Sequence, residues 1–147
     1  MTWRQIHEAD GQRSFVLILK SGEEAMAAVT EMAKMERLFA AQITGIGAFE
    51  EAVIRYFDWS DKSYHDIPVA EQVEVASLIG DIASGENGEP AIHIHLVLGR
   101  RDGSAMAGHL KSGKVRPTLE LIITEAPAHL KRTHDPDSGL ALISLGR

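Results

Sequence analysis

The sequence predicts an α+β domain with one long helix, at about residues 22–41, packed on a mainly antiparallel sheet of about eight strands. Only one stretch has apolar residues at helical spacing, and the other apolar segments are short or alternate as strands do. The connections between successive strands are too short for crossover helices, which favours antiparallel pairing. A length of 147 residues without an internal repeat or linker predicts a single domain, residues 1–147.

The first half of the sequence predicts an arm, a strand and the helix. Residues 1–13 are expected to form an N-terminal arm, either loose or paired with a sheet edge. Residues 14–19 are a short apolar run, which predicts a buried strand. Ser21 and Glu24 have the spacing of a capping box, so the helix is expected to begin next to them. The apolar stripe of this helix comprises Ala25, Val29, Met32, Met35 and Phe39.

The rest of the chain has the pattern of strands. Gly45 and Gly47 lie within the first of them and indicate a bulge or a close approach of two backbones. They do not form a dinucleotide-binding loop, because the third glycine is missing and a strand follows. The expected strands are residues 42–49, 52–59, 64–69, 72–82, 91–98, 105–111, 118–125 and 140–145.

Composition and charge restrict the function. The chain has 15 basic and 21 acidic residues, a net charge of −6, which disfavours generic binding to nucleic acid. It contains no cysteine, so thiolate metal sites and cysteine nucleophiles are excluded. No segment has the length of a membrane span or the pattern of a signal peptide. We therefore expect a cytoplasmic protein without membrane attachment.

The strongest chemical signal is the segment Ile92-His93-Ile94-His95-Leu96. Because alternate residues of a strand share a face, His93 and His95 point to one side and the apolar residues to the other. A turn and a second strand with His109 follow. An antiparallel hairpin with an index sum of 204 places His109 opposite His95, and a sum of 202 places it opposite His93. Either register brings the three imidazoles to one face.

Three imidazoles on adjacent strands match the ligand set of an open catalytic zinc site. Copper, iron and nickel also accept imidazole ligands, and a polar sheet face without any metal is the alternative. We expect His93, His95 and His109 to bind one divalent metal, zinc before the others. Binding requires neutral imidazoles, so it should weaken as the pH falls through their titration near ~6.5.

A second expected site is a binding site for a small anion. Residues 100–132 hold seven basic and three acidic side chains, against the acidic trend of the chain. A solvated basic surface is the ordinary interpretation of such a segment. The functional alternative is that Arg100, Arg101 and Lys111 favour an anionic ligand close to the histidines.

Several short motifs in order resemble the PPC domain, the plants and prokaryotes conserved domain. The resemblance covers about residues 14–145, and the motif order makes it fairly specific. The matching segments are Gly45-Ile46-Gly47-Ala48, Tyr56-Phe57-Asp58, Glu74-Val75-Ala76-Ser77-Leu78-Ile79-Gly80, His93-Ile94-His95-Leu96, Gly108-His109-Leu110 and Val115-Arg116-Pro117-Thr118-Leu119-Glu120.

This resemblance implies an α+β fold, a homotrimer, and the provisional label of DNA-binding protein that prokaryotic members carry. In some of those members equivalent histidines hold a metal. The chain has no Arg-Gly-Arg-Pro AT-hook, and residues 72–76 depart from the plant Gly-Arg-Phe-Glu-Ile-Leu motif, so DNA binding by this chain is not expected. Apolar residues such as Val97 and Ile122 on the second sheet face also predict association with further copies.

Two function classes remain open at this point. One is an oligomeric binding protein of the PPC type with a three-histidine metal site and no chemistry of its own. The other is a small zinc-dependent enzyme whose substrate the sequence does not name. No catalytic residue is identifiable from the sequence.

Overall fold

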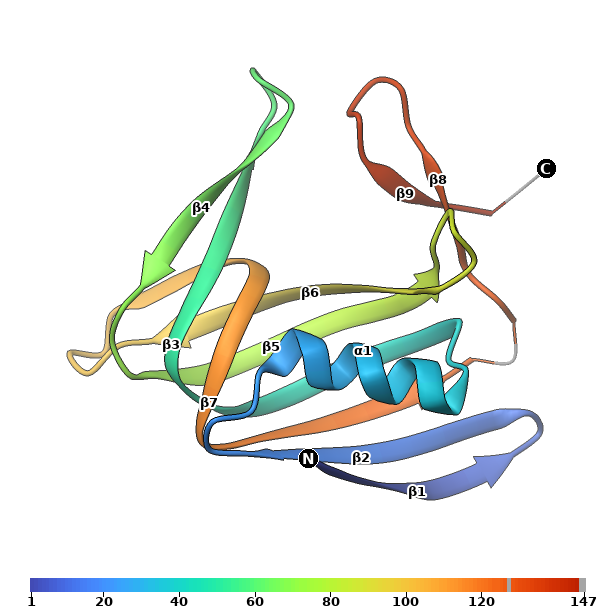
Figure 1. The fold of residues 1–147 in the computed structure, drawn as a ribbon, viewed down its shortest axis with the longest axis horizontal. Coiled ribbons are helices and arrows are strands. Elements are labelled where there is room, and N and C mark those ends of the chain that lie inside the picture. Colours follow the sequence, from blue (N-terminus) through green and yellow to red (C-terminus); the bar gives the residue numbers. More distant parts are fainter. Residues whose placement is uncertain (127, 146–147) are drawn as a thin grey trace.

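The computed structural model describes residues 1–126 and 128–145. These residues form one α-helix and nine strands (Figure 1). The elements are β1 (Thr2–Ala9), β2 (Gln12–Lys20), α1 (Ala25–Glu36), β3 (Ala40–Asp58), β4 (Ser63–Val69), β5 (Val73–Ser84), β6 (Pro90–Gly99), β7 (Ala105–Glu125), β8 (Lys131–His134) and β9 (Ala141–Ser144).

The strands belong to a single, mainly antiparallel sheet, so the predicted α+β class is confirmed. Its main path has the order β1-β2-β7-β3-β5-β8-β9, while β4 pairs with β3 and β6 pairs with β5 and β7. The contact between β5 and β8, at Ser84 and Lys131, is parallel, and the other strand pairs are antiparallel. Residues 1–13, expected as an arm, contain β1, which pairs with β2.

The prediction of a long helix at residues 22–41 is wrong. The helix α1 has 12 residues and begins after Glu24, whose own carboxylate accepts hydrogen bonds from the backbone N–H groups of Met26 and Ala27. It ends at Arg37, which adopts a left-handed conformation with φ 55°. The apolar pattern in the sequence continues past Arg37 because Leu38 and Ala40 are also buried, but Ala40 is already the first residue of β3.

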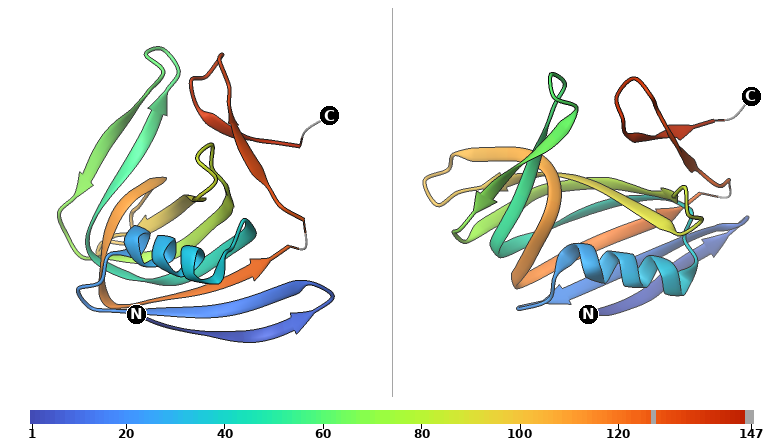
Figure 2. Two further views of the ribbon diagram at one scale, coloured as in Figure 1. Left: turned by 45° about the vertical axis from the view of Figure 1, so that its right-hand side comes forward. Right: turned by 45° about the horizontal axis from the view of Figure 1, so that its top comes forward.

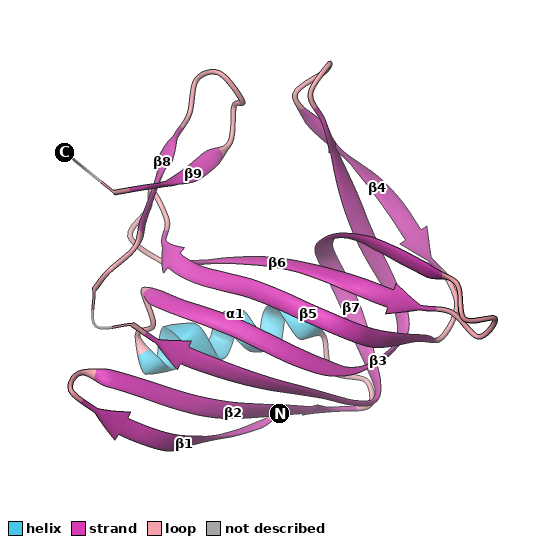
Figure 3. Cartoon of the chain, turned by 180° about the vertical axis from the view of Figure 1, so that it is seen from behind, coloured by secondary structure: helices cyan, strands magenta, loops and turns pink. Residues whose placement is uncertain are grey.

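The helix covers one face of the sheet (Figure 2). Its buried residues, among them Val29 and Met32, pack in one hydrophobic core with the inward side chains of the strands. Figure 3 shows the sheet from the opposite side, with the helix behind the strands. Apolar side chains are exposed on this open face, including Ile46 at 62%, Ile79 at 60% and Ile122 at 50%.

Two pairs of predicted strands are each one long strand. Residues 42–49 and 52–59 both lie in β3, and residues 105–111 and 118–125 both lie in β7. Register shifts interrupt the pairing between β3 and β7, so a strand that looks broken in sequence bends without ending. At Gly47 a Cβ atom would lie 2.3 Å from the carbonyl oxygen of Thr118, which confirms the expected close approach of two backbones.

Two hairpins, β3–β4 and β8–β9, project from the sheet on the same side (Figure 1). Their tips are linked because the Lys62 Nζ donates a hydrogen bond of 2.7 Å to the carbonyl oxygen of Asp137. Among the described residues, no helix has the length and apolar character needed to cross a membrane.

Candidate metal centre

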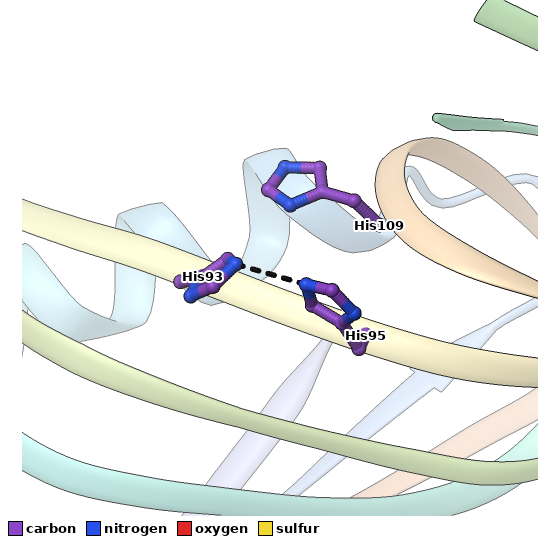
Figure 4. Close-up of side chains that lie close together, drawn as sticks. All are labelled: His93, His95 and His109. Atoms are coloured by element: carbon purple, nitrogen blue, oxygen red, sulfur yellow. Dashed lines mark hydrogen bonds between the residues drawn. The ribbon is translucent and has the colours of Figure 1, made fainter. Parts of the chain in front are cut away.

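The three predicted histidines converge on the β6–β7 hairpin. His95 pairs directly with His109, which is the register with the index sum of 204. One ligand atom from each of His93, His95 and His109 lies within 4.8 Å of the other two. Figure 4 shows the three rings turned toward a common space.

Alternation of the two strands explains why the rings share a face. Ile94, Leu96 and Leu110 are at most 3% exposed and point into the core on the helix side. Their neighbours His93, His95 and His109 therefore point to the open face. The adjacent strand β5 lies close to β6 here, because a Cβ atom at Gly80 would be 2.4 Å from the carbonyl oxygen of His93. A glycine at this position is thus required by the backbone spacing beside the site.

The surroundings favour neutral imidazoles at two of the three positions. Burial, together with the charges of the neighbouring His93 and His95, lowers the pKa of His109 to about 4. Burial also lowers the pKa of His95, with a smaller contribution from His93. The His109 ring is therefore neutral well below the usual imidazole pKa of ~6.5, and the His95 ring is shifted in the same direction; metal ligands must be neutral imidazoles.

Two observations on the rings fit a missing ligand. The Nδ1 atom of His109 is buried and has no hydrogen-bond partner among the described residues. A buried polar atom without a partner is rare in folded proteins. In addition, the Nε2 atoms of His93 and His95 are 3.0 Å apart and share a hydrogen bond, so both nitrogens face the same space. The three-imidazole set fits a divalent metal of the zinc type.

A carboxylate and a guanidinium lie directly behind His93, and sequence reasoning missed both. Asp81 on β5 pairs in register with His93, with 3.5 Å between its Oδ2 and the His93 Nδ1. Arg132 on β8 lies 2.5 Å from the Asp81 Oδ1. Burial raises the pKa of Asp81, but the hydrogen bonds with His93 and Arg132 lower it more, so the net shift is downward. The sequence signal for Asp81 was a charged residue near the end of the largely apolar strand β5.

The β3–β4 hairpin contributes an aromatic ring and a second guanidinium. The Tyr64 ring centroid lies 4.9 Å from that of His109, and Arg55 pairs in register with His109. A pocket of about 210 Å³ opens next to the histidines. It is lined by Tyr64, His93, His109, Arg132, the start of β6, and residues 140–142 at the start of β9. Two of the three histidine rings, those of His93 and His109, thus form part of the pocket wall.

The predicted anion-binding residues are not gathered at the histidines. Arg100 and Arg101 lie in the turn between β6 and β7, and Arg100 pairs with Glu71 at 3.1 Å. Lys111 lies on β7 two residues beyond His109, and its ammonium pairs with Asp66 at 2.5 Å. Arg55, which shares Asp66 with Lys111, and Arg132, which pairs with Asp81, are further cations beside the rings.

Comparison with known proteins agrees with the motif-based resemblance. A protein of the plant- and prokaryote-conserved (PPC) type from Pyrococcus horikoshii is 28% identical, with a TM-score of 0.84 over 99% of this chain and 96% of that chain. A metal-containing protein from Archaeoglobus fulgidus is 30% identical, with a TM-score of 0.84 over 96% of this chain and 99% of that chain. A protein from Bacteroides thetaiotaomicron, provisionally named DNA-binding, is 29% identical, with a TM-score of 0.86 over 99% of both chains.

Sequence comparisons give a partial relative and a family. The bifunctional protein GlmU of Synechococcus sp. is 23% identical over 130 residues, and the chain spans only about a fifth of that protein's length. The family description "Plants and Prokaryotes Conserved (PCC) domain" matches residues 6–127, which include all of the three-histidine hairpin. The chain therefore belongs to the Plants and Prokaryotes Conserved domain family.

Proposed function

We propose that this chain binds one divalent metal, zinc, through His93, His95 and His109. The observation that carries the proposal is the convergence of the three ligand atoms within 4.8 Å, with a buried and unpartnered nitrogen on one of the rings. Three protein ligands are typical of zinc sites that keep a position open for a further ligand. The relative from Archaeoglobus fulgidus is itself described as metal-containing, which supports the same chemistry here.

The proposed metal centre belongs to an oligomeric binding protein, and we propose a homotrimer. The open sheet face carries exposed Ile46, Ile79 and Ile122 close together, whereas most large apolar side chains of the described residues are buried. Burial of such a patch against further copies removes it from water. Ile79 pairs in register with His95, so the apolar patch and the proposed metal site adjoin each other.

A metal-dependent enzyme is the second candidate, and the pocket beside the rings favours it. A zinc held by the three histidines would supply a Lewis acid next to this pocket. The residues around it would bind and orient a small molecule: Tyr64 offers an aromatic wall, and the guanidinium of Arg132, which is paired with Asp81, forms part of the lining. Arg100, Arg101 and Lys111 do not line this pocket, so any effect on an anionic ligand there would be indirect.

DNA binding is not part of the proposal, although several relatives are provisionally named for it. Several basic residues of the segment 100–132 already have carboxylate partners: Lys114 and Arg116 share Glu50, and Arg132 pairs with Asp81. A net charge of −6 adds a general repulsion from phosphate.

The metal content of protein purified without a polyhistidine tag tests the proposal. Elemental analysis should find zinc, or another divalent metal, in the wild type and little in His93→Ala and His109→Ala variants. The exposed His7, on the edge strand β1, provides the matched control, and His7→Ala should retain the wild-type content. Equal metal content in all four proteins, or none in any after loading at neutral pH, would refute the proposed site.

A further inference from the structure

Arg132 is one of the two buried polar or charged residues in the described part of the chain, with 9% exposure. It lies on β8, beyond the segment 6–127 that matches the family. Its Nη2 donates to the Asp81 Oδ1 at 2.5 Å, and its Nη1 donates to the carbonyl oxygen of Ala141 at 3.0 Å. The guanidinium therefore ties the β8–β9 hairpin to the carboxylate of Asp81 on β5.

Both partners of this ion pair reach the same nitrogen of His93. The His93 Nδ1 lies 3.5 Å from the Asp81 Oδ2 and 3.4 Å from the Arg132 Nη2. A guanidinium can only donate hydrogen bonds, and an ionised carboxylate can only accept them. The short hydrogen bond of the Arg132 Nη2 goes to the Asp81 Oδ1, so its 3.4 Å contact with the His93 Nδ1 is the weaker one, and the acceptor for a protonated Nδ1 is the Asp81 Oδ2.

The two nitrogens of His93 thus have different partners. The Nδ1 faces the carboxylate, and the Nε2 lies 3.0 Å from the His95 Nε2 on the side of the proposed metal. A neutral imidazole with its proton on Nδ1 has its lone pair on Nε2, which is the form that ligates a metal through Nε2. A carboxylate that accepts a hydrogen bond from the non-ligating ring nitrogen sets the tautomer and the orientation of a metal-bound histidine.

We propose that Asp81 and Arg132 are positioning residues for the metal centre: Asp81 holds His93 in its Nδ1–H tautomer, and Arg132 holds Asp81. The proposal rests on the metal function proposed above, but it concerns a different property. If Arg132 has this role, the β8–β9 hairpin is a functional part of the site. Among the described contacts, Arg132 makes the ion pair that joins this hairpin to β5.

The tautomer of His93 can be measured without any metal. Long-range proton–nitrogen correlation spectra of the metal-free, ¹⁵N-labelled full chain, at a fixed pH where His93 is neutral, distinguish the two ring forms. We expect the Nδ1–H form in the wild type. In Asp81→Asn an amide N–H can donate to Nδ1, so we expect a change toward the Nε2–H form. A wild-type His93 in the Nε2–H form, or a tautomer that Asp81→Asn leaves unchanged, would overturn the proposal.

The affinity for Zn²⁺, measured by competition with a chelator at the same pH, is the second readout. We expect Asp81→Asn to weaken binding by about 10–100-fold, the usual effect of losing such a partner. Arg132→Gln should weaken it in the same direction, and Arg132→Lys should restore part of the loss because an ammonium still pairs with Asp81. Glu125→Gln is the matched control, since it breaks the half-buried ion pair of Arg13 and Glu125 at 2.5 Å, remote from the histidines.

The two proposals fail in different ways. If the wild type binds no Zn²⁺, the metal function is wrong, and the tautomer measurement still decides the role of Asp81. If the wild type binds Zn²⁺ and Asp81→Asn and Arg132→Gln bind it as tightly as Glu125→Gln does, the metal function holds and the positioning role is wrong. Thermal unfolding of each variant checks that a loss of affinity does not come from a loss of folding.

Discussion

His109 combines the properties that distinguish a ligand from a surface histidine. It lies opposite His95, its ring is close to Tyr64, and its Nδ1 has no partner among the described residues. Its pKa of about 4 follows first from burial and then from the neighbouring imidazoles and guanidinium groups. The protein thus maintains a neutral imidazole at a position where protonation is costly, which is the form a metal needs.

This low pKa predicts a pH dependence of stability for the metal-free protein. In the unfolded chain His109 titrates near ~6.5, and in the folded chain at about 4. Between these values the unfolded state binds more protons, so stability is complete above pH ~6.5 and falls as the pH decreases toward 4. The free energy of unfolding, measured in urea at several pH values, should fall less steeply in His109→Gln. An equal slope in both proteins would contradict the pKa assignment.

Sequence reasoning reached the three histidines but not the residues behind them, for a physical reason. The trio depends on a local hairpin, in which the two-residue period and the index sum place His93, His95 and His109 on one face. Asp81 and Arg132 reach the site through β5 and β8, whose pairing depends on contacts distant in sequence. Local patterns carry no information about such pairings, and the ion pairs of Arg100 and Lys111 were missed for the same reason.

At the scale of elements, the helix and the long strands show where sequence patterns mislead. Apolar spacing continues through Leu38 into the buried start of β3, so the end of α1 at Arg37 is set by backbone conformation rather than by polarity. In β3 and β7, bulges bend continuous strands and so imitate strand ends. The strand β8 was not predicted, because its four residues are too short and polar to give a pattern.

The short helix still anchors the covered face of the sheet, which predicts an asymmetry between two methionines. Met32 is fully buried, whereas Met35, expected in the apolar stripe, is 61% exposed. Met32→Ala should reduce the free energy of unfolding by about 2–5 kcal/mol, because it removes buried methylene groups and leaves a cavity. Met35→Ala should change it by less than about 0.5 kcal/mol. Chemical denaturation of both variants measures the difference, and similar losses would contradict the packing described here.

At the scale of the whole molecule, the open face of the sheet predicts self-association. We expect light scattering to give three times the chain mass at micromolar concentration. Ile79→Asp places a charge in the centre of the exposed patch and should shift the mass toward the monomer. Met35→Asp, at an equally exposed site on the helix side, should leave the assembly intact. A monomeric wild type, or an assembly that tolerates Ile79→Asp, would contradict this surface assignment.

The charge of the whole molecule predicts weak binding to DNA. A gel shift with random duplex at physiological salt should show no complex at submicromolar protein, because phosphate binding depends on unpaired lysine and arginine. The basic residues of segment 100–132 are mostly paired with carboxylates. Tight binding that weakens steeply with added salt would show instead that a basic surface forms on assembly of the chains.

The central claim is that three histidines of one hairpin form a metal site. Its most direct test is a titration of Zn²⁺ into the metal-free, untagged chain, followed by calorimetry, beside the same titration of His109→Ala. We predict saturation at one Zn²⁺ per chain in the wild type, and a loss of this binding in the variant because two imidazoles remain of the three. No saturable binding in the wild type, or the same affinity and stoichiometry in His109→Ala, would contradict the claim.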